Sequence, residues 1–131
     1  MFIIQIVFFR IPSPQTDSLG AKLLWVNPNP NENFIPQTIH IDISSYKFLI
    51  LFFNYALGSN RFSSQMAMTN LDDKEQYLSS VDGWKVRSRK IISTYNNEIV
   101  FGIGRSSSFN NAGGDTEDNG AIIPYEIYGL K

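Results

Sequence analysis

The chain has 131 residues, which suits one domain with one core, and its 43% of hydrophobic residues argue against a globally disordered protein. Eleven Lys and Arg against twelve Asp and Glu leave a net charge of −1, which excludes a bulk electrostatic attraction to nucleic acid or to an anionic membrane. The absence of cysteine excludes disulfides, thiolate nucleophiles and Cys-ligated zinc.

The chain begins with MFIIQIVFF, which is apolar at eight of nine positions. This stretch lacks the basic n-region and small-residue cleavage site of a signal peptide, and it falls short of the roughly 20 residues that span a bilayer as a helix. We expect a strand buried on both faces, with another chain as one candidate partner. Residues 1–19 are therefore expected to form an apolar strand and a Pro/Ser linker ahead of one module over residues 20–131.

Short segments with a period of two follow, separated by Pro, Gly, Asn and Ser, and they predict an antiparallel sandwich or barrel. The apolar run at residues 23–26 ends before NPNPN, where Pro28 and Pro30 withhold backbone donors and make a semi-rigid corner. Residues 38–43 alternate cleanly and predict a strand with one wet side. Residues 46–55 are apolar on both faces and predict a central strand.

Two further segments precede the basic part of the chain. Residues 62–69 alternate between apolar and polar side chains and predict another half-buried strand. The stretch NLDDKEQYL, residues 70–78, is the one helical candidate, because Asn70 can serve as N-cap and acidic residues occupy the first turn.

A hairpin is predicted around residues 96–97, because asparagine tolerates the positive φ that a two-residue type I′ turn requires. Pairing outward from that turn sets Tyr95 opposite Glu98 and Ile92 opposite Phe101. The same pairing predicts one core face that consists of Trp84, Val86, Ile92, Ile99, Phe101 and Ile103.

Residues 105–120 are rich in Ser, Asn, Gly and acids, which predicts a long loop. Asp115, Glu117 and Asp118 offer oxygen donors of the kind that calcium uses, but the EF-hand spacing is not met and a solvated loop tip is favoured. We therefore expect no bound metal ion. If one were bound, these three acids would be the candidate ligands, although the evidence for them is weak. The terminal AIIPYEIYGLK predicts a last strand, in which Pro124 indicates an edge or a bulge.

His40 is the one histidine and lies two positions before Asp42, so both side chains share the wet face of the predicted strand. Such a pair could orient an imidazole for base catalysis. No serine elbow, second histidine or recognisable acid pair accompanies it, so a surface histidine is the favoured interpretation. We expect no enzymatic activity and no cofactor.

A basic stripe is predicted in WKVRSRK, where the period of two sets Lys85, Arg87 and Arg89 on one side, opposite the expected core face. Arginine could make bidentate contacts with phosphate or carboxylate groups of an anionic polymer. A solvated strand face, or pairing with acids of a neighbouring strand or subunit, is the favoured alternative. The candidate ligand-binding set consists of these three residues, Tyr95 at the hairpin tip and Arg105.

Three separated motifs carry a resemblance to a known family. LLWVNPNPNENF, QTIHIDISSYKFLILFF and IIPYEIYGLK occur in this order, with a basic strand, IVFGIG and a Gly/Asn/Ser loop before the last of them. Over residues 20–131 this order resembles a module of tail-fibre and minor structural proteins from phages and prophages of Gram-positive hosts and gut bacteria. The motif residues look structural: residues 27–30 as a turn, 37–42 as a strand and 123–129 as the closing strand.

The resemblance implies a receptor-binding module of the virion tail, usually homotrimeric, that meets host-surface saccharides or anionic wall polymers and neighbouring tail proteins. Apolar runs that exceed what one small sandwich covers also favour a homo-oligomer. We expect an all-β, antiparallel, jelly-roll-like sandwich that acts in host adhesion without catalysis, nucleic-acid binding or membrane insertion, in a phage or prophage-encoded particle. The alternatives are a purely structural trimerisation or baseplate connector and a bacterial carbohydrate-binding module.

Overall fold

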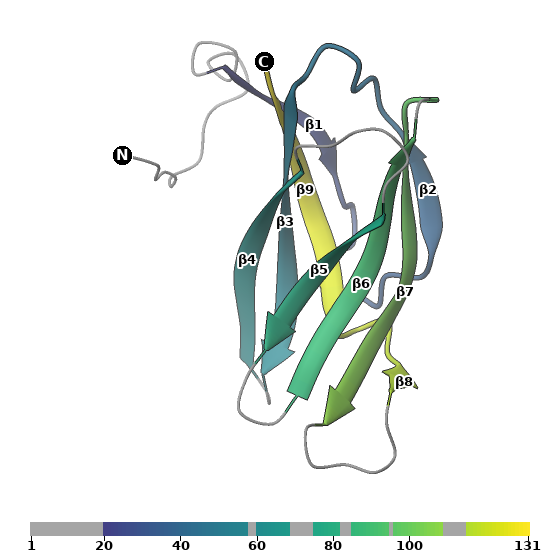
Figure 1. The fold of residues 1–131 in the computed structure, drawn as a ribbon. Helices are drawn as coiled ribbons and strands as arrows, with labels where there is room; N and C mark the ends of the chain where they lie inside the picture. The colour runs from purple at the N-terminus through teal and green to yellow at the C-terminus, as the bar shows by residue number, and fades with distance from the viewer. Residues whose placement is uncertain (1–19, 58–59, 69–74, 82–84, 95, 109–114) are drawn as a thin grey trace.

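The computed structural model describes residues 20–57, 60–68, 75–81, 85–94, 96–108 and 115–131, and these form a sandwich of two antiparallel sheets (Figure 1). The first sheet has the order β1-β9-β3-β4, with bounds Ala21–Val26, Ile122–Leu130, Phe48–Leu57 and Asn60–Met68. The second has the order β2-β7-β6-β5, with bounds Gln37–His40, Glu98–Ser108, Lys85–Thr94 and Glu75–Val81. The short β8 (Thr116–Glu117) also pairs with β7. The predicted antiparallel sandwich is confirmed.

The chain passes between the two sheets in the manner of a jelly roll. It crosses from β1 to β2, back to β3, from β4 to β5, and finally from β8 to β9. Strands that follow one another in the chain also pair: β3 with β4, β5 with β6, and β6 with β7. As a result β9 lies between β1 and β3, and the chain end at Lys131 lies near the start of β1 (Figure 1).

The core lies between the facing sides of the two sheets. On β3 the alternate residues Leu49, Leu51 and Phe53 are buried, because β3 lies between β9 and β4 as the predicted central strand. Ile99 and Phe101 of β7 are buried against them from the second sheet. Full burial of such a side chain contributes about 1.5–3 kcal/mol, so this cluster supplies the main stabilisation of the sandwich.

The NPNPN segment is a corner, as predicted, and a buried asparagine fixes it. The side chain of Asn27 donates a hydrogen bond to the Pro124 carbonyl (2.9 Å) and accepts one from the Asn29 amide (2.8 Å). The Asn27 amide donates to the Tyr125 carbonyl (2.9 Å). Because a buried polar group needs partners, these three bonds stabilise one conformation of the link between β1 and β2.

The closing strand contains the bulge that Pro124 indicates. Phe52 pairs with Glu126 and Phe53 with Pro124, so one extra residue of β9 lies between the two pairs. The other suggestion, an edge strand, is wrong, because β9 has a neighbour on each side.

The β6–β7 hairpin is present, but its predicted pairing is wrong by one residue. Thr94, rather than Tyr95, pairs with Glu98, so three residues connect the strands instead of two. Asn97 has a φ of 59°, the left-handed conformation common in three-residue hairpin loops. Ile92 consequently lies opposite Val100, and Ile91 lies opposite Phe101.

This slip exchanges the two faces of β6, since side chains alternate along a strand. Arg87, Arg89, Ile91 and Ser93 point into the sandwich, whereas Val86 and Ile92 are half-buried on the outer side. The predicted core face is therefore correct for Ile99 and Phe101 but wrong for the residues of β6. Ile103 is also only half-buried, because the pairing shifts between Arg89 and Ile91. Trp84 and Tyr95 lie outside the described residues.

Two other segments differ from prediction. Residues 75–78, expected at the end of a helix, belong to strand β5, and residues 69–74 lie outside the described part. The expected loop over residues 105–120 is partly strand, since β7 continues to Ser108 and β8 pairs with it. No helix among the described residues is long and apolar enough to cross a membrane.

Candidate functional site: a polar cleft at one end of the sandwich

Arg89, predicted to contact a ligand, is fully buried between the sheets. Its guanidinium donates to the carbonyls of Ile122 (2.9 Å), Gly102 (2.7 Å) and Asn119 (3.1 Å), and it lies 5.2 Å from the centroid of the Phe34 ring. Burial lowers the pKa of Arg89 to about 10, and the nearby Asp118 carboxylate opposes that shift. Arg89 is therefore a structural residue that ties β6 to β7, β9 and the turn before β9.

The predicted basic stripe does not form a solvent-facing surface. Arg87 is buried, with 8% of its surface exposed, whereas Lys85 is exposed at the start of β6. Arg105 is exposed but pairs with Ser88, an outward position of the sheet, so it lies on the opposite side from Arg87. The physical reason is the hairpin slip, which turns the odd-numbered residues of β6 inward. Tyr95 lies outside the described residues.

The acidic residues at 115–118 also have structural contacts. The Asp118 amide donates to the Gly104 carbonyl (2.7 Å), and its carboxylate accepts from the Gly120 amide (3.1 Å). Glu117 accepts a long hydrogen bond from the Asn119 side chain (3.4 Å), and Asp115 is exposed. Within the described ranges no three His, Cys, Asp or Glu side chains come together as a metal site.

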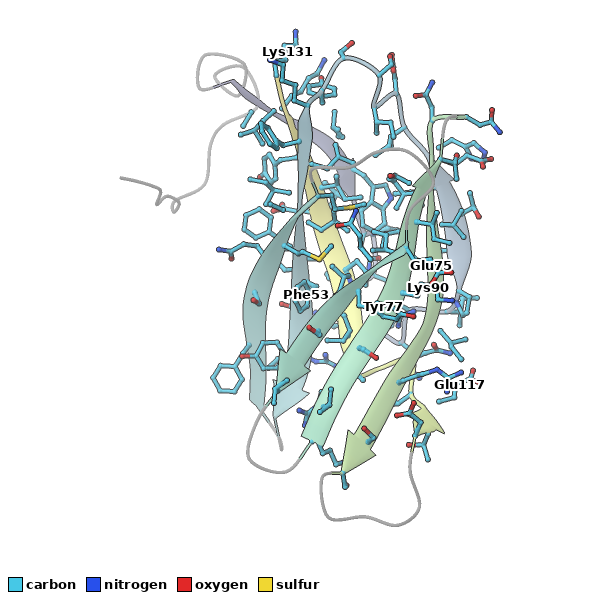
Figure 2. The ribbon with its side chains drawn as sticks, viewed as in Figure 1. Phe53, Glu75, Tyr77, Lys90, Glu117 and Lys131 are labelled. Atoms are coloured by element: carbon cyan, nitrogen blue, oxygen red, sulfur yellow. The ribbon has the colours of Figure 1, made fainter. Side chains whose placement is uncertain are left out.

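A polar cleft lies instead where four segments meet at one end of the sandwich. It has a volume of about 450 Å³ and is formed by the start of β1, the end of β2, the β2–β3 turn and the chain end. Figure 2 shows Lys131 at this end. The lining residues are Lys22, Leu24, His40, Ile41, Asp42, Ser45, Tyr46 and Lys131.

The β2–β3 turn that forms one wall of the cleft is held by the β6–β7 hairpin. The Ile41 amide donates to the Asn97 carbonyl (3.0 Å), and the Ile43 amide donates to the Asn97 side-chain oxygen (3.3 Å). The side chain of Ile43 is buried in the core. The left-handed Asn97 thus positions the turn that forms this wall of the cleft.

Asp42 is the acidic group of the cleft. Its carboxylate accepts hydrogen bonds from the Ser44 hydroxyl (2.7 Å) and the Ser44 amide (3.1 Å). These bonds, the side-chain bond first, lower the pKa of Asp42 below its ordinary value because they stabilise the charged form. Asp42 is therefore a fixed carboxylate, available to accept hydrogen bonds from hydroxyl groups.

His40 is exposed on the wet face of β2, as predicted, but its partner is not Asp42. The His40 Nε2 lies 2.9 Å from an oxygen of Glu98, its cross-strand neighbour. Glu98 is thereby engaged outside the cleft lining, and an Asp42-oriented imidazole is not formed. His40 is thus a surface histidine that is paired with Glu98 across the β2–β7 ladder.

Tyr46 supplies the aromatic surface of the cleft, and Gly129 determines where the ring lies. A Cβ added at Gly129 would approach the Tyr46 Cγ and Cδ1 atoms to 2.7 Å and Leu24 Cδ1 to 2.9 Å. Only glycine allows the ring to pack this closely against β9. The half-buried Tyr46 is therefore held against the sheet and stays partly open to the cleft.

The cleft combines two exposed lysines, Lys22 and Lys131, with the imidazole of His40 and one carboxylate. The lining side chains alone sum to +1, from two lysines and one aspartate with His40 neutral, although the side chains of the whole chain sum to −1. Sequence reasoning singled out His40 and Asp42 but missed both lysines and Tyr46. Those three lie at element ends, and only the order of the strands brings them together.

No protein-family model matches the chain, and neither the curated proteins nor the solved structures provide a match.

Proposed function

We propose that this protein is a non-catalytic binding module whose ligand is an anionic saccharide or a related wall polymer. The observation that carries the proposal is the cleft, in which an aromatic ring, a fixed carboxylate and two lysines face one open volume. An aromatic ring offers an apolar face to a sugar ring, the carboxylate accepts from sugar hydroxyls, and lysines attract carboxylate or phosphate groups. Binding of a saccharide by these three kinds of group requires no nucleophile.

We further propose a role in a phage or prophage tail fibre, where adhesion to the host surface requires this kind of site. The support is the resemblance of the three sequence motifs and the way they contact one another in the fold. The first motif pairs with the last through Trp25 and Ile127, and Asn27 donates to the Pro124 carbonyl. The middle motif continues into the turn that forms the cleft wall. The motifs thus act as the frame of the cleft.

A purely structural connector is the second candidate function. The outer face of the first sheet is rich in apolar side chains, among them Val26 and Phe48, which are 50% and 41% exposed. Exposed apolar patches on small proteins mark association surfaces, so this face favours assembly with other tail proteins or with further copies in a homotrimer. The two functions differ in whether a saccharide binds at all.

Calorimetric titration with an oligogalacturonate and with a glycerol-phosphate teichoic acid tests the proposal, with neutral dextran as the comparison polymer. We expect the charged probes to bind and the affinity to fall with added salt, because exposed charge pairs are screened. Replacing both Lys22→Ala and Lys131→Ala should weaken binding by roughly tenfold or more, since each removes one attractive charge.

The matched control is the double variant Lys85→Ala and Lys90→Ala, which removes the same charge from strand β6, outside the cleft lining. It should bind within about twofold of the unmodified protein, because its distance from the ligand leaves only screened interactions. Equal losses in both double variants would contradict the cleft as the site. No binding of either charged probe would favour the connector.

A further inference from the structure

Strand β4 forms one edge of the first sheet, since it pairs with β3 on one side and, among the described residues, with no strand on the other (Figure 1). Its nine residues pair with β3 in one unbroken register, so β4 contains no bulge. It also contains no proline, and its one charged residue is Arg61. Such an edge presents backbone N–H and C=O groups to which a further strand can add.

Two other edge strands of the sandwich have features that protect a sheet edge. The register of β1 shifts between Leu23 and Trp25, and β2 has only four residues and follows Pro36 directly. Bulges, short strands and prolines all hinder the addition of a strand. Of the described edge strands only β5 resembles β4, because it too is regular and free of proline.

Two copies of β4 fit one another in antiparallel orientation about a two-fold axis at Ser64. On the core-facing side Phe62 then lies opposite Met66 of the second copy, so apolar side chains meet. The Phe62 ring is stacked on Tyr55 at 5.9 Å, yet Phe62 remains 43% exposed. A second copy of β4 would cover this apolar surface.

The outer side of β4 is self-complementary in the same register. There Ser63 lies opposite Gln65 of the second copy, and both positions are exposed and polar. Arg61 lies opposite Ala67 of the second copy, which sets the two arginines six residues apart along the ladder, at about 20 Å. Because charges are screened beyond roughly 8 Å at physiological ionic strength, this arrangement carries little repulsion.

Strand β5 lacks this complementarity although its edge is equally regular. Two copies of β5 paired about Leu78 would set the exposed Tyr77 opposite Ser79, and the Glu75 carboxylate opposite the exposed Val81. Apolar side chains would thus face polar ones along the outer side. The pattern of side chains therefore favours β4 over β5 as a self-pairing edge.

We infer that two copies of this chain associate through β4, so that the four strands of each first sheet join in one continuous sheet. The same surface serves both copies, as in other two-fold contacts. Backbone hydrogen bonds along the edge and the covering of Phe62 provide the stabilisation. No residue of β4 belongs to the lining of the cleft, so the inference does not depend on the ligand.

Sedimentation equilibrium of the full chain, with paired charge variants, tests the inference and its register. The double variant Ser63→Glu and Gln65→Glu sets carboxylates opposite one another across the contact, whereas Ser63→Lys and Gln65→Glu sets an ammonium group opposite a carboxylate. Both variants lose the same exposed hydrogen bond from the Ser63 hydroxyl to Asn54 (2.9 Å). Circular dichroism verifies that each variant is folded.

We expect the unmodified protein to show a monomer–dimer equilibrium between about 1 μM and 1 mM, the range in which small contacts of this kind associate. The Glu–Glu variant should raise the dissociation constant roughly tenfold or more, and the Lys–Glu variant should keep it at or below the unmodified value. The control Tyr77→Glu and Ser79→Glu, which adds the same charge to the edge strand β5, should stay within about twofold.

Three results would overturn the inference. The first is a protein that stays monomeric over the whole concentration range. The second is association that the Glu–Glu variant leaves unchanged, which would place the contact elsewhere on the molecule. The third is an equal loss in the Glu–Glu variant and in either the Lys–Glu variant or the β5 control, which would exclude the proposed pairing of β4 with itself.

Discussion

At the residue level, the guanidinium of Arg89 occupies a position between the sheets that an apolar side chain would ordinarily fill. Its three carbonyl acceptors come from β7, β9 and the turn at Asn119, so one side chain joins three segments. Gly104 leaves room for it, since an added Cβ there would lie 2.9 Å from the Arg89 Nη2. The positive charge predicted an exposed side chain, because the residues next to Arg89 in the sequence do not distinguish it from Arg87.

Arg89→Ala should lower the free energy of unfolding by about 3 kcal/mol or more, because it leaves buried carbonyls without donors and removes packed volume. Arg89→Lys should recover only part of the loss, since an ammonium group cannot match the planar set of three bonds. Urea unfolding followed by fluorescence measures both changes.

Lys90→Ala is the matched control for this prediction, because Lys90 is the next residue and its ion pair with Glu75 is exposed. Its effect should stay within about 0.5 kcal/mol. A similar loss for Lys90→Ala and Arg89→Ala would contradict a structural role that is special to Arg89.

The carboxylate of Asp42 gives a prediction about pH. Its pKa is lowered by the Ser44 hydroxyl and amide, so the stabilisation of the turn is present above the ordinary pKa of aspartate. That stabilisation is lost as the pH falls through the lowered value. Ser44→Ala should therefore raise the pKa of Asp42 toward its ordinary value, as measured by NMR titration of the side-chain carbonyl carbon.

Ser45→Ala changes the neighbouring hydroxyl, which does not contribute to the lowered pKa of Asp42, and should leave that pKa where it is. If Ser44→Ala also leaves the pKa of Asp42 unchanged, the hydrogen bonds from Ser44 are not the cause of the lowered pKa.

At the level of elements, the β6–β7 hairpin explains most of the difference between prediction and structure. The Asn96-Asn97 pair correctly indicates the turn, but asparagine can serve both two-residue and three-residue loops. The choice between them depends on which face of β6 packs inside, and Arg89 finds its carbonyl acceptors only through tertiary contacts. A short sequence window therefore cannot resolve the register, and an error of one residue inverts the whole face.

Asn97→Ala should destabilise the protein by about 1–2 kcal/mol, because alanine is strained at positive φ and the bond to the Ile43 amide is lost. Asn97→Gly should cost less, since glycine accepts this conformation and only the side-chain bond is missing. Thermal unfolding gives the comparison, with Asn96→Ala as the control at an exposed neighbouring position. Equal stability of the alanine and glycine variants would argue against conformational strain at this position.

Strand β5 shows a second limit of local patterns. The acidic residues after Asn70 favour a helix start in isolation, yet residues 75–81 pair with β6 along their whole length. Burial alternates along β5, as it does in a strand with one face in the core. Tyr77 and Ser79 are exposed, whereas Leu78 is buried and Gln76 and Ser80 are half-buried. Tertiary pairing overrides a weak helical signal here, as it often does for a segment of one or two turns.

At the level of the whole molecule, composition and the period of two were sufficient for the sandwich, the central strand β3 and the corner at Asn27. The cleft was not predictable in the same way, because Lys22, Tyr46 and Lys131 are far apart in the chain and meet only when β1, β3 and β9 become neighbours. Apolar side chains on the outer face of the first sheet, such as Val26 and Phe48, lie outside the cleft lining. The fold thus separates a candidate ligand site from a candidate association surface.

The central claim is that the polar cleft binds an anionic saccharide, and chemical-shift mapping of the ¹⁵N-labelled protein with an oligogalacturonate tests it most directly. We predict that the perturbed backbone amides cluster at Lys22, His40, Asp42, Tyr46 and Lys131, and that neutral dextran of similar length leaves them unchanged. Perturbations centred on Lys85 or Arg105, or none at millimolar probe, would contradict the account.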